Sequence, residues 1–366
     1  MEKVDLLIAP INIVTVNARR EEIADGMAAI KNGRFVYVGK NIPGRFESEK
    51  VINAEGKYLF PGFVNPHVHL FQALLKGLGR DKALIDWLNA SVRKALPKID
   101  AEDALAAATA GCMENLRSGV TTLLDYMYCH GTDLYTLDEA VLDAFETTGI
   151  RGYLGRAHTE VKGLGCPVEE TEDQYFEILN QLVPKLKTKP RTGLFITPGI
   201  IWDHTVEGFE KTREYADKHG VGITMHTIET LEDDVYSQEH FGAATMAFLD
   251  AHGVLGPDFL AVHCVQASDE DIRLMAKNDV KVIHCPVANM ILASGFAPIK
   301  KMKQAGLTIG LATDGAGSND SQNYLETLKF AALIHKAVER DPAFLPAYEV
   351  LEMATIDGAK CMGLEK

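Results

Sequence analysis

The stretch PGFVNPHVHL, residues 61–70, contains a short apolar run that ends in two histidines separated by one residue. It is part of the first of eight short apolar runs that alternate with longer amphipathic segments along the chain. The eight runs cover residues 59–69, 120–126, 152–156, 192–197, 222–226, 259–263, 280–284 and 308–312. Eight strands that alternate with helices predict an α/β protein whose parallel sheet closes into a (β/α)8 TIM-type barrel.

A doubly wound open sheet is the alternative arrangement for this pattern. Open sheets that bind nucleotides carry glycine-rich phosphate loops after an early strand. No GxGxxG follows the first apolar run, and no GxxxxGK[ST] occurs anywhere in the chain. The closed barrel is therefore favoured.

Residues 1–56, which precede the first run, are predicted to form short strands. The segment GMAAIKNGRFVYVG, residues 26–39, places Asn32-Gly33 between two apolar runs, which is a strong hairpin signal. We expect a small β-sandwich-like domain over residues 1–56 and a metal-dependent barrel over residues 57–366. The chain ends directly after the last expected barrel helix, so we expect the C-terminal part of the small domain to be missing, through truncation or through reduction of that domain.

Composition and charge exclude several classes of partner. The chain has 37 Lys and Arg against 51 Asp and Glu, which gives a formal net charge of −14. Such an acidic chain without a dense basic run repels nucleic acid and anionic lipid. Its six cysteines form no CxxC pair, no signal peptide is evident, and no apolar run approaches the ~18 residues of a membrane span. We expect a cytoplasmic protein that binds neither nucleic acid nor membranes, and a homo-oligomer is compatible with the sequence.

Histidine or aspartate stands at the end of five of the eight predicted strands. These residues are the pair His67 and His69, then His226, His263, His284 and Asp314. In a barrel of this type the chemistry lies at the carboxyl ends of the strands, and strand alternation puts both histidines of an HxH pair on one face. A single strand-end histidine is more often structural, and for His284 both roles stay open. The joint arrangement predicts a metal site, in which water loses a proton near pH ~7.

Glu229 lies three residues beyond His226. A carboxylate at that position is not required as a metal ligand. It is suited to move the proton of the attacking water, because it can act first as a base and then as an acid.

The same residues lie in motifs that resemble the amidohydrolase superfamily. The motifs are PGFVNPHVHL at 61–70, MHTIET at 225–230, AVHC at 261–264 and ATDGAGSND at 312–320. Two further segments, LLKGLGRDKALIDWL at 74–88 and HCPVANMILASGFAPI at 284–299, are similar to the cytosine-deaminase-like group. That group includes methylthioadenosine/S-adenosylhomocysteine deaminases, guanine and pterin deaminases, and triazine hydrolases. The resemblance covers nearly the whole chain.

The resemblance implies a site with one divalent transition metal. Zinc is favoured, with iron or manganese as alternatives. The implied ligands are His67, His69, His226 and Asp314. Glu229 is the implied proton shuttle, and His263 is implied to orient the attacking water or the substrate. The segment GLFITP at 193–198, which includes most of the predicted fourth strand, offers no lysine for carboxylation, which disfavours the two-metal branch of the superfamily.

The resemblance implies an aminohydrolase that replaces the exocyclic amino group of a small aromatic N-heterocycle with oxygen and releases ammonia. Asp314 is expected to take part in the proton transfers. The candidate substrate contacts are Arg156, Trp202, Phe71 and His284.

Three alternatives remain for the function. The substrate could be an adenosine derivative, but Gly199 replaces a histidine that is usual in the nucleoside deaminases, and this favours free heterocycles. The leaving group could be the chloride or alkylamine of a triazine. The chain could also be a non-catalytic scaffold, although it keeps every expected ligand.

Overall fold

The computed structural model describes residues 1–130, 135–158 and 170–365. The chain divides into two compact units, Met1–Gly62 and Phe63–Lys366. The second unit contains an eight-stranded sheet in which every neighbouring pair is parallel and the strands follow one another in chain order. The strands are β8 (Phe63–Val68), β9 (Val120–Met127), β10 (Arg151–Ala157), β11 (Thr192–Thr197), β12 (Gly222–Thr227), β13 (Phe259–His263), β14 (Lys281–His284) and β15 (Ile309–Leu311).

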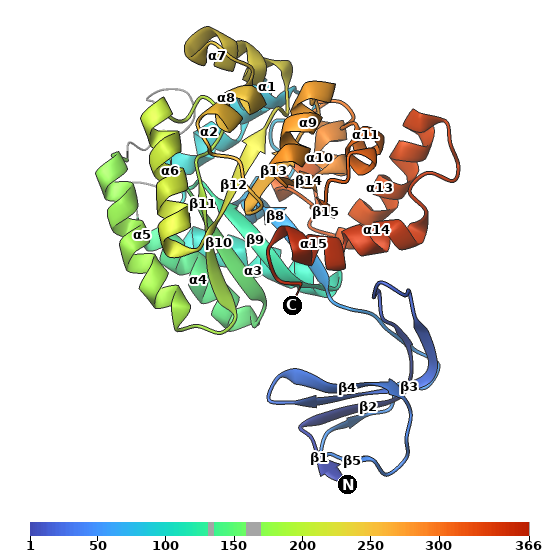
Figure 1. Cartoon of the computed structure of the whole chain (residues 1–366). Coiled ribbons are helices and arrows are strands. Elements are labelled where there is room, and N and C mark those ends of the chain that lie inside the picture. The colour runs from blue at the N-terminus through green and yellow to red at the C-terminus, as the bar shows by residue number, and fades with distance from the viewer. Residues whose placement is uncertain (131–134, 159–169, 366) are drawn as a thin grey trace. The chain divides into compact units, whose positions relative to one another are not determined.

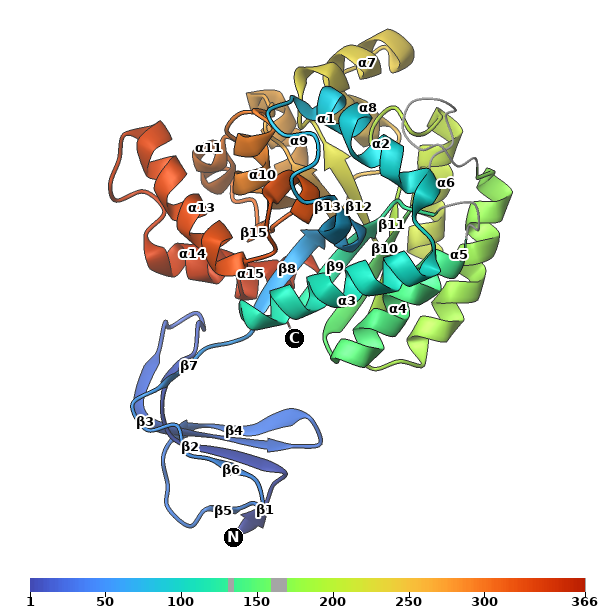
Figure 2. The ribbon, with the colours of Figure 1, turned by 180° about the vertical axis from the view of Figure 1, so that it is seen from behind.

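Helices surround this sheet (Figure 1), and Figure 2 shows α3 and α4 outside β9 and β10. The helical elements are η1 (Leu70–Leu75), α1 (Leu84–Ala90), α2 (Val92–Ala95), η2 (Leu96–Lys98), α3 (Ala101–Arg117), α4 (Thr136–Thr148), α5 (Glu172–Lys187), α6 (Val206–His219), α7 (Leu231–Phe241), α8 (Thr245–Ala251), α9 (Asp269–Lys277), α10 (Pro286–Ile291), α11 (Ile299–Gln304), α12 (Ala316–Asn319), α13 (Tyr324–Glu339), α14 (Ala347–Met353) and α15 (Ile356–Cys361). Among the described helices, none is long and apolar enough to cross a membrane. The predicted (β/α)8 barrel is confirmed.

The first unit consists of short strands, as expected for this part of the chain. They are β1 (Glu2–Lys3), β2 (Leu6–Val14), β3 (Glu22–Lys31), β4 (Arg34–Lys40), β5 (Phe46–Glu47), β6 (Val51–Ile52) and β7 (Tyr58–Leu59). The antiparallel strands β3 and β4 are joined at Asn32 and Gly33, which have φ values of 52° and 69°. Two successive positive φ values are typical of the two-residue hairpin turn that Asn-Gly favours.

Side-chain hydrogen bonds connect the last barrel strand, β15, with the first, β8. The hydroxyl of Tyr324 lies 2.7 Å from the carbonyl oxygen of Val64 and 2.6 Å from that of Leu311. Further along the same seam, Asn65 donates to the Thr313 hydroxyl at 2.9 Å and accepts from the Thr313 backbone N–H at 3.1 Å. These buried contacts join β8 to β15, the first and last strands of the sheet.

Candidate active site

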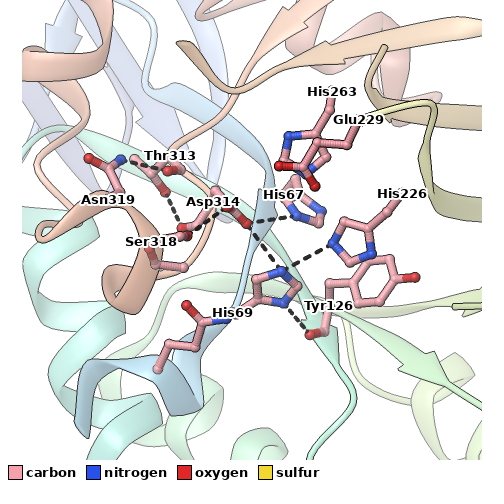
Figure 3. A network of polar contacts seen from close by, with 12 residues as sticks. His67, His69, Tyr126, His226, Glu229, His263, Thr313, Asp314, Ser318 and Asn319 are labelled. Carbon is pink, nitrogen blue, oxygen red and sulfur yellow. Dashed lines mark hydrogen bonds and ion pairs between the residues drawn. The ribbon is translucent and has the colours of Figure 1, made fainter. Parts of the chain in front are cut away.

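Four side chains converge at the carboxyl end of the barrel (Figure 3). His67 lies on β8 with His69 just beyond the end of that strand, His226 comes from β12, and Asp314 follows β15. Nε2 of His67 and Nε2 of His69 each lie 3.1 Å from Oδ1 of Asp314. One potential ligand atom from each of the four residues lies within 4.8 Å of the others. The structure therefore brings together the four residues that the family resemblance implied as ligands.

Hydrogen bonding determines which nitrogen of His69 can serve as a ligand. Nδ1 of His69 lies 2.7 Å from the carbonyl oxygen of Tyr126, which can only accept, so Nδ1 carries a proton and, in the neutral ring, Nε2 has the lone pair. That nitrogen lies 3.2 Å from Nε2 of His226. Imidazole nitrogens this close together are typical ligands of a buried transition metal. A backbone carbonyl that accepts from the other ring nitrogen, as Tyr126 does for His69, is typical of such sites.

The charges of the cluster are those of metal ligands. Burial lowers the pKa of His67 to about 3 and, together with the neighbouring imidazoles, lowers the pKa of His226 well below its ordinary value. Burial alone raises the pKa of Asp314, but the contacts of its carboxylate with the rings of His67 and His69 hold that pKa well below its usual range. At neutral pH, His67 and His226 are thus neutral imidazoles and Asp314 is a carboxylate, and groups of these kinds can together bind a divalent cation.

Asp314 is held by its surroundings on the side away from the histidines. The Ser318 hydroxyl donates to Oδ2 of Asp314 at 2.7 Å, and the Asp314 backbone N–H donates to the carbonyl of His67 at 3.2 Å. Asp314 has a φ of 63°, which is costly for a residue other than glycine and occurs where neighbouring structure enforces it. The carboxylate therefore has one oxygen left to face the cluster.

Glu229 and His263 lie beside these four residues (Figure 3). Oε2 of Glu229 is 3.6 Å from Nε2 of His263, and the Ser294 hydroxyl donates to Oε1 of Glu229 at 3.0 Å. On the other side of its ring, Nδ1 of His263 is 2.9 Å from Oδ1 of Asn289. Burial raises the pKa of Glu229 above its ordinary value. A carboxyl whose pKa moves toward neutrality is suited to give and take protons near pH 7.

A cavity opens onto this cluster. Its polar end is formed by His69, His226, Glu229, His263 and Asp314. Its other walls are mostly apolar and include Leu84, Trp87, Leu88, Val92, Ile200, Trp202 and Leu292.

Of the four side chains predicted to contact substrate, Trp202 lines this cavity, whereas Arg156, His284 and Phe71 do not. Arg156 points away because strand residues alternate: its neighbour Ala157 lines the cavity, so Arg156 faces the helices. There its guanidinium donates to Asp138 at 2.7 Å and to both oxygens of Glu170. The predicted substrate contact of Arg156 is therefore replaced by a buried ion-pair network.

The same correction applies to His284 and Phe71. Nε2 of His284 is 2.9 Å from Nε2 of His335 on α13, so this side chain also turns toward the helices. Phe71 is buried in η1, with its ring centroid 4.8 Å from that of Tyr128 and perpendicular to it. Both residues pack behind the cavity wall.

Several polar residues that line the cavity were not singled out from the sequence. They include Gln72, Arg93, Tyr128 and Asp203. Gln72 donates to the Tyr128 hydroxyl at 2.8 Å and accepts from the Gly317 backbone N–H at 3.2 Å. These residues lie in helical or loop segments whose direction no periodic pattern indicates. The position of Gln72, three residues after the HxH pair, is the one signal that could have suggested its place.

A family model described as the amidohydrolase family matches residues 58–366 of this chain. The chain belongs to the amidohydrolase family. This membership confirms the sequence-based assignment. It also confirms, together with relatives that are named as deaminases, the prediction of a metal-dependent enzyme that hydrolyses carbon–nitrogen bonds.

Two relatives of this amidohydrolase match nearly its entire length. The 5-methylthioadenosine/S-adenosylhomocysteine deaminase of Nitratidesulfovibrio vulgaris (strain DP4) is 33% identical over 363 residues, covering 99% of this chain and 80% of the relative. The 5'-deoxyadenosine deaminase of Methanosarcina mazei is 33% identical over 365 residues, covering 99% of this chain and 81% of the relative.

A solved structure of an adenosine deaminase from Xanthomonas campestris with bound zinc has a TM-score of 0.91 to this amidohydrolase. It is 27% identical in sequence, and the match covers 100% of this chain and 81% of that one. Together with the cluster of His67, His69, His226 and Asp314, this similarity supports a site for a divalent metal.

Proposed function

We propose that this chain is a zinc-dependent deaminase that converts the amino group of an adenine nucleoside into a carbonyl oxygen and releases ammonia. The observation that carries the proposal is the convergence of four ligand-type side chains with Glu229 and His263 at one end of a single cavity. A scaffold without activity has no need for a proton-transfer carboxyl beside a set of neutral imidazoles.

The proposed ligands are His67, His69, His226 and Asp314. Three imidazole nitrogens and one carboxylate oxygen suit zinc, and the bound zinc of the Xanthomonas campestris relative supports the choice. When bound, a zinc ion supplies water that ionises near pH ~7 and a positive charge that stabilises developing negative charge.

Glu229 is the proposed proton carrier. In the reaction, the water oxygen bonds to the carbon that carries the amino group, one water proton goes to the adjacent ring nitrogen, and the other leaves with the amino group as ammonia. Glu229 lines the cavity, its pKa is raised by burial, and the Ser294 hydroxyl fixes one of its oxygens. The other oxygen is thus available to transfer the first proton.

His263 and Asp314 complete the proposed machinery. Nδ1 of His263 is occupied by Asn289, so the ring presents Nε2 to the cavity beside Glu229. We assign His263 to orienting the attacking water or the ring of the substrate. Asp314 is assigned to the transfer of the second proton to the departing amino group.

Adenine nucleosides are the proposed substrates for two reasons. Two relatives that match nearly the whole chain are named as deaminases of adenosine derivatives, which gives this class more weight than the sequence alone did. The cavity is also mostly apolar beyond its polar end, with Trp202 available to pack against a flat ring or its substituent.

An ammonia-release screen of the zinc-loaded protein tests the proposal. The compounds are adenosine, 5-methylthioadenosine, S-adenosylhomocysteine, guanine, pterins and aminotriazines. We expect kcat/KM to be highest for an adenine nucleoside, by at least tenfold over the free heterocycles. The proposal is wrong if no compound releases ammonia, or if a free heterocycle or a triazine is the best substrate.

A further inference from the structure

Gly199 and Asp203 share one volume in the wall of the cavity, and both line it. Gly199 has a φ of 77°, and a Cβ added there would lie 2.3 Å from Oδ2 of Asp203. The carboxylate of Asp203 thus occupies the space that a side chain at position 199 would need. The absence of a side chain at 199 is what admits an acidic group into the wall.

The Asp203 carboxylate has unused capacity to accept hydrogen bonds. Oδ2 accepts from the Ile200 backbone N–H at 3.1 Å, whereas Oδ1 accepts from no residue that the structure describes. A carboxylate can accept about four hydrogen bonds, and its burial without them is costly. Asp203 is only 8% exposed, so bulk water does little to satisfy it.

Tyr126 relates this carboxylate to the metal ligands. Its ring centroid is 4.1 Å from that of His226, and its hydroxyl donates to the carbonyl oxygen of Gly199. The Tyr126 side chain therefore connects Gly199, at its hydroxyl, with His226, at its ring. A heterocycle whose amino-bearing carbon reacts beside His226 would place its substituent, not its reacting edge, toward Asp203.

The charge nearby indicates which kind of group the carboxylate would meet. Arg93 lines the same cavity and acts electrostatically on Asp203. A positive group already in place disfavours a cationic ligand and leaves a neutral hydrogen-bond donor as the better complement.

We propose that Asp203 is a specificity-determining residue that accepts a hydrogen bond from a sugar hydroxyl of the substrate. This inference rests on the proposed deaminase function and assigns the part of the substrate that Asp203 recognises. Burial raises the pKa of Asp203 to about 7, and the Ile200 N–H and Arg93 oppose that rise. A donor from the ligand would further stabilise the charged form.

The test compares adenosine with 2',3'-dideoxyadenosine, which lacks both ring hydroxyls of the sugar. The readout is the ratio of their kcat/KM values for wild type, Asp203→Ala and Asp203→Asn, all loaded with zinc. We expect wild type to prefer adenosine by ~5–150-fold, the range for one buried polar group left unpaired. Asp203→Ala should bring the ratio close to one, and Asp203→Asn, which keeps an oxygen for the Ile200 N–H, should give an intermediate ratio.

Two further variants separate recognition from folding. Asp143→Ala, which removes an exposed carboxylate on α4, should keep the wild-type ratio. Gly199→Ala should lower the ratio without changing residue 203, because the added Cβ displaces the carboxylate. Dissociation constants of inosine and 2',3'-dideoxyinosine should show the same pattern without turnover, and they also serve if Asp203→Ala folds poorly while Asp203→Asn does not.

A wild-type ratio near one, or a ratio that persists in both folded Asp203 variants, overturns the assignment to Asp203 while the deaminase function stands. Absence of ammonia release from every nucleoside and heterocycle instead refutes the deaminase function, and this inference with it.

Discussion

At the scale of single residues, His67 is the proposed ligand whose loss should affect metal binding most plainly. It is fully buried, and its Nε2 is 3.1 Å from Asp314. In His67→Ala the remaining three ligands hold the ion far less well, so we expect metal content to fall from about one ion per chain to a small fraction of that. Metal analysis after dialysis measures this.

The matched control is His240→Ala, which removes an exposed histidine on α7 and should leave the metal content unchanged. Full metal content in folded His67→Ala would remove His67 from the ligand set. About two ions per wild-type chain would contradict the single-metal site.

Glu229 provides the second residue-scale prediction. Glu229→Gln keeps the shape and the contact with Ser294 but removes the group that carries the proton. We expect kcat to fall by the ~10²–10⁴-fold typical of general acid–base catalysis, with metal content and melting temperature close to wild type. Glu326→Gln, on the exposed face of α13, should retain wild-type turnover. A metal-replete Glu229→Gln protein with near-normal kcat would show that another group moves the proton.

At the scale of elements, the free energy of unfolding should depend on one hydroxyl at the seam between β8 and β15. Tyr324 is completely buried, and its hydroxyl lies within hydrogen-bond distance of a carbonyl on each strand. Tyr324→Phe leaves buried carbonyl oxygens without this partner, so we expect a loss of ~1–3 kcal/mol in the free energy of unfolding. Urea titration measures the change. Tyr58→Phe, whose residue is 62% exposed, is the control, and an equally small effect at both positions would show that the hydroxyl does not stabilise the seam.

The elements also explain what could be predicted from the sequence. Barrel strands are buried on both faces, so their apolar runs were recognisable, and β11 and β13 begin and end at the predicted residues. The phase of each strand was not readable, because a run that is apolar throughout does not indicate which residues face inward. That is why Arg156 and His284, both at strand ends, were expected at the cavity although they face the helices.

The proposed metal ligands could be predicted despite this ambiguity, because they are ligand-type residues that lie in recognisable motifs. The HxH spacing puts His67 and His69 on the same side of β8 whichever phase the strand adopts. The cavity wall could not be predicted in this way. The Asp203 carboxylate fits there only because Gly199, four residues earlier, has no side chain. Only the three-dimensional placement of the loop after β11 reveals that relation.

At the scale of the whole molecule, the buried ion pairs should make stability depend on pH. Burial alone raises the pKa of Glu170, but the hydrogen bond with His158 and the Arg156 guanidinium hold it at about 2, below its ordinary 4.5. A carboxyl with a lowered pKa in the folded state contributes stability that is present above pH 4.5 and is lost as the pH falls toward 2. We expect the wild-type urea midpoint to fall across this window.

Glu170→Gln should be less stable than wild type at pH 7 and should lose less stability between pH 4.5 and 3. The titrations are made with chelator present, so that metal release at low pH does not contribute. Glu326→Gln should keep the wild-type pH dependence. The same pH dependence in Glu170→Gln and wild type would mean that Glu170 is not responsible for the acid sensitivity.

The central claim is that this molecule is a metal-dependent deaminase, and one measurement tests it most directly. Ammonia and inosine are quantified with adenosine as substrate for the protein as purified, after chelation, and after zinc is restored. We predict one ammonia and one inosine for each adenosine consumed, loss of both products after chelation, and recovery when about one zinc ion per chain is bound. Unchanged ammonia release after complete metal removal would contradict the claim, and so would a protein that holds one zinc ion per chain but releases no ammonia from adenosine or from any other compound of the screen.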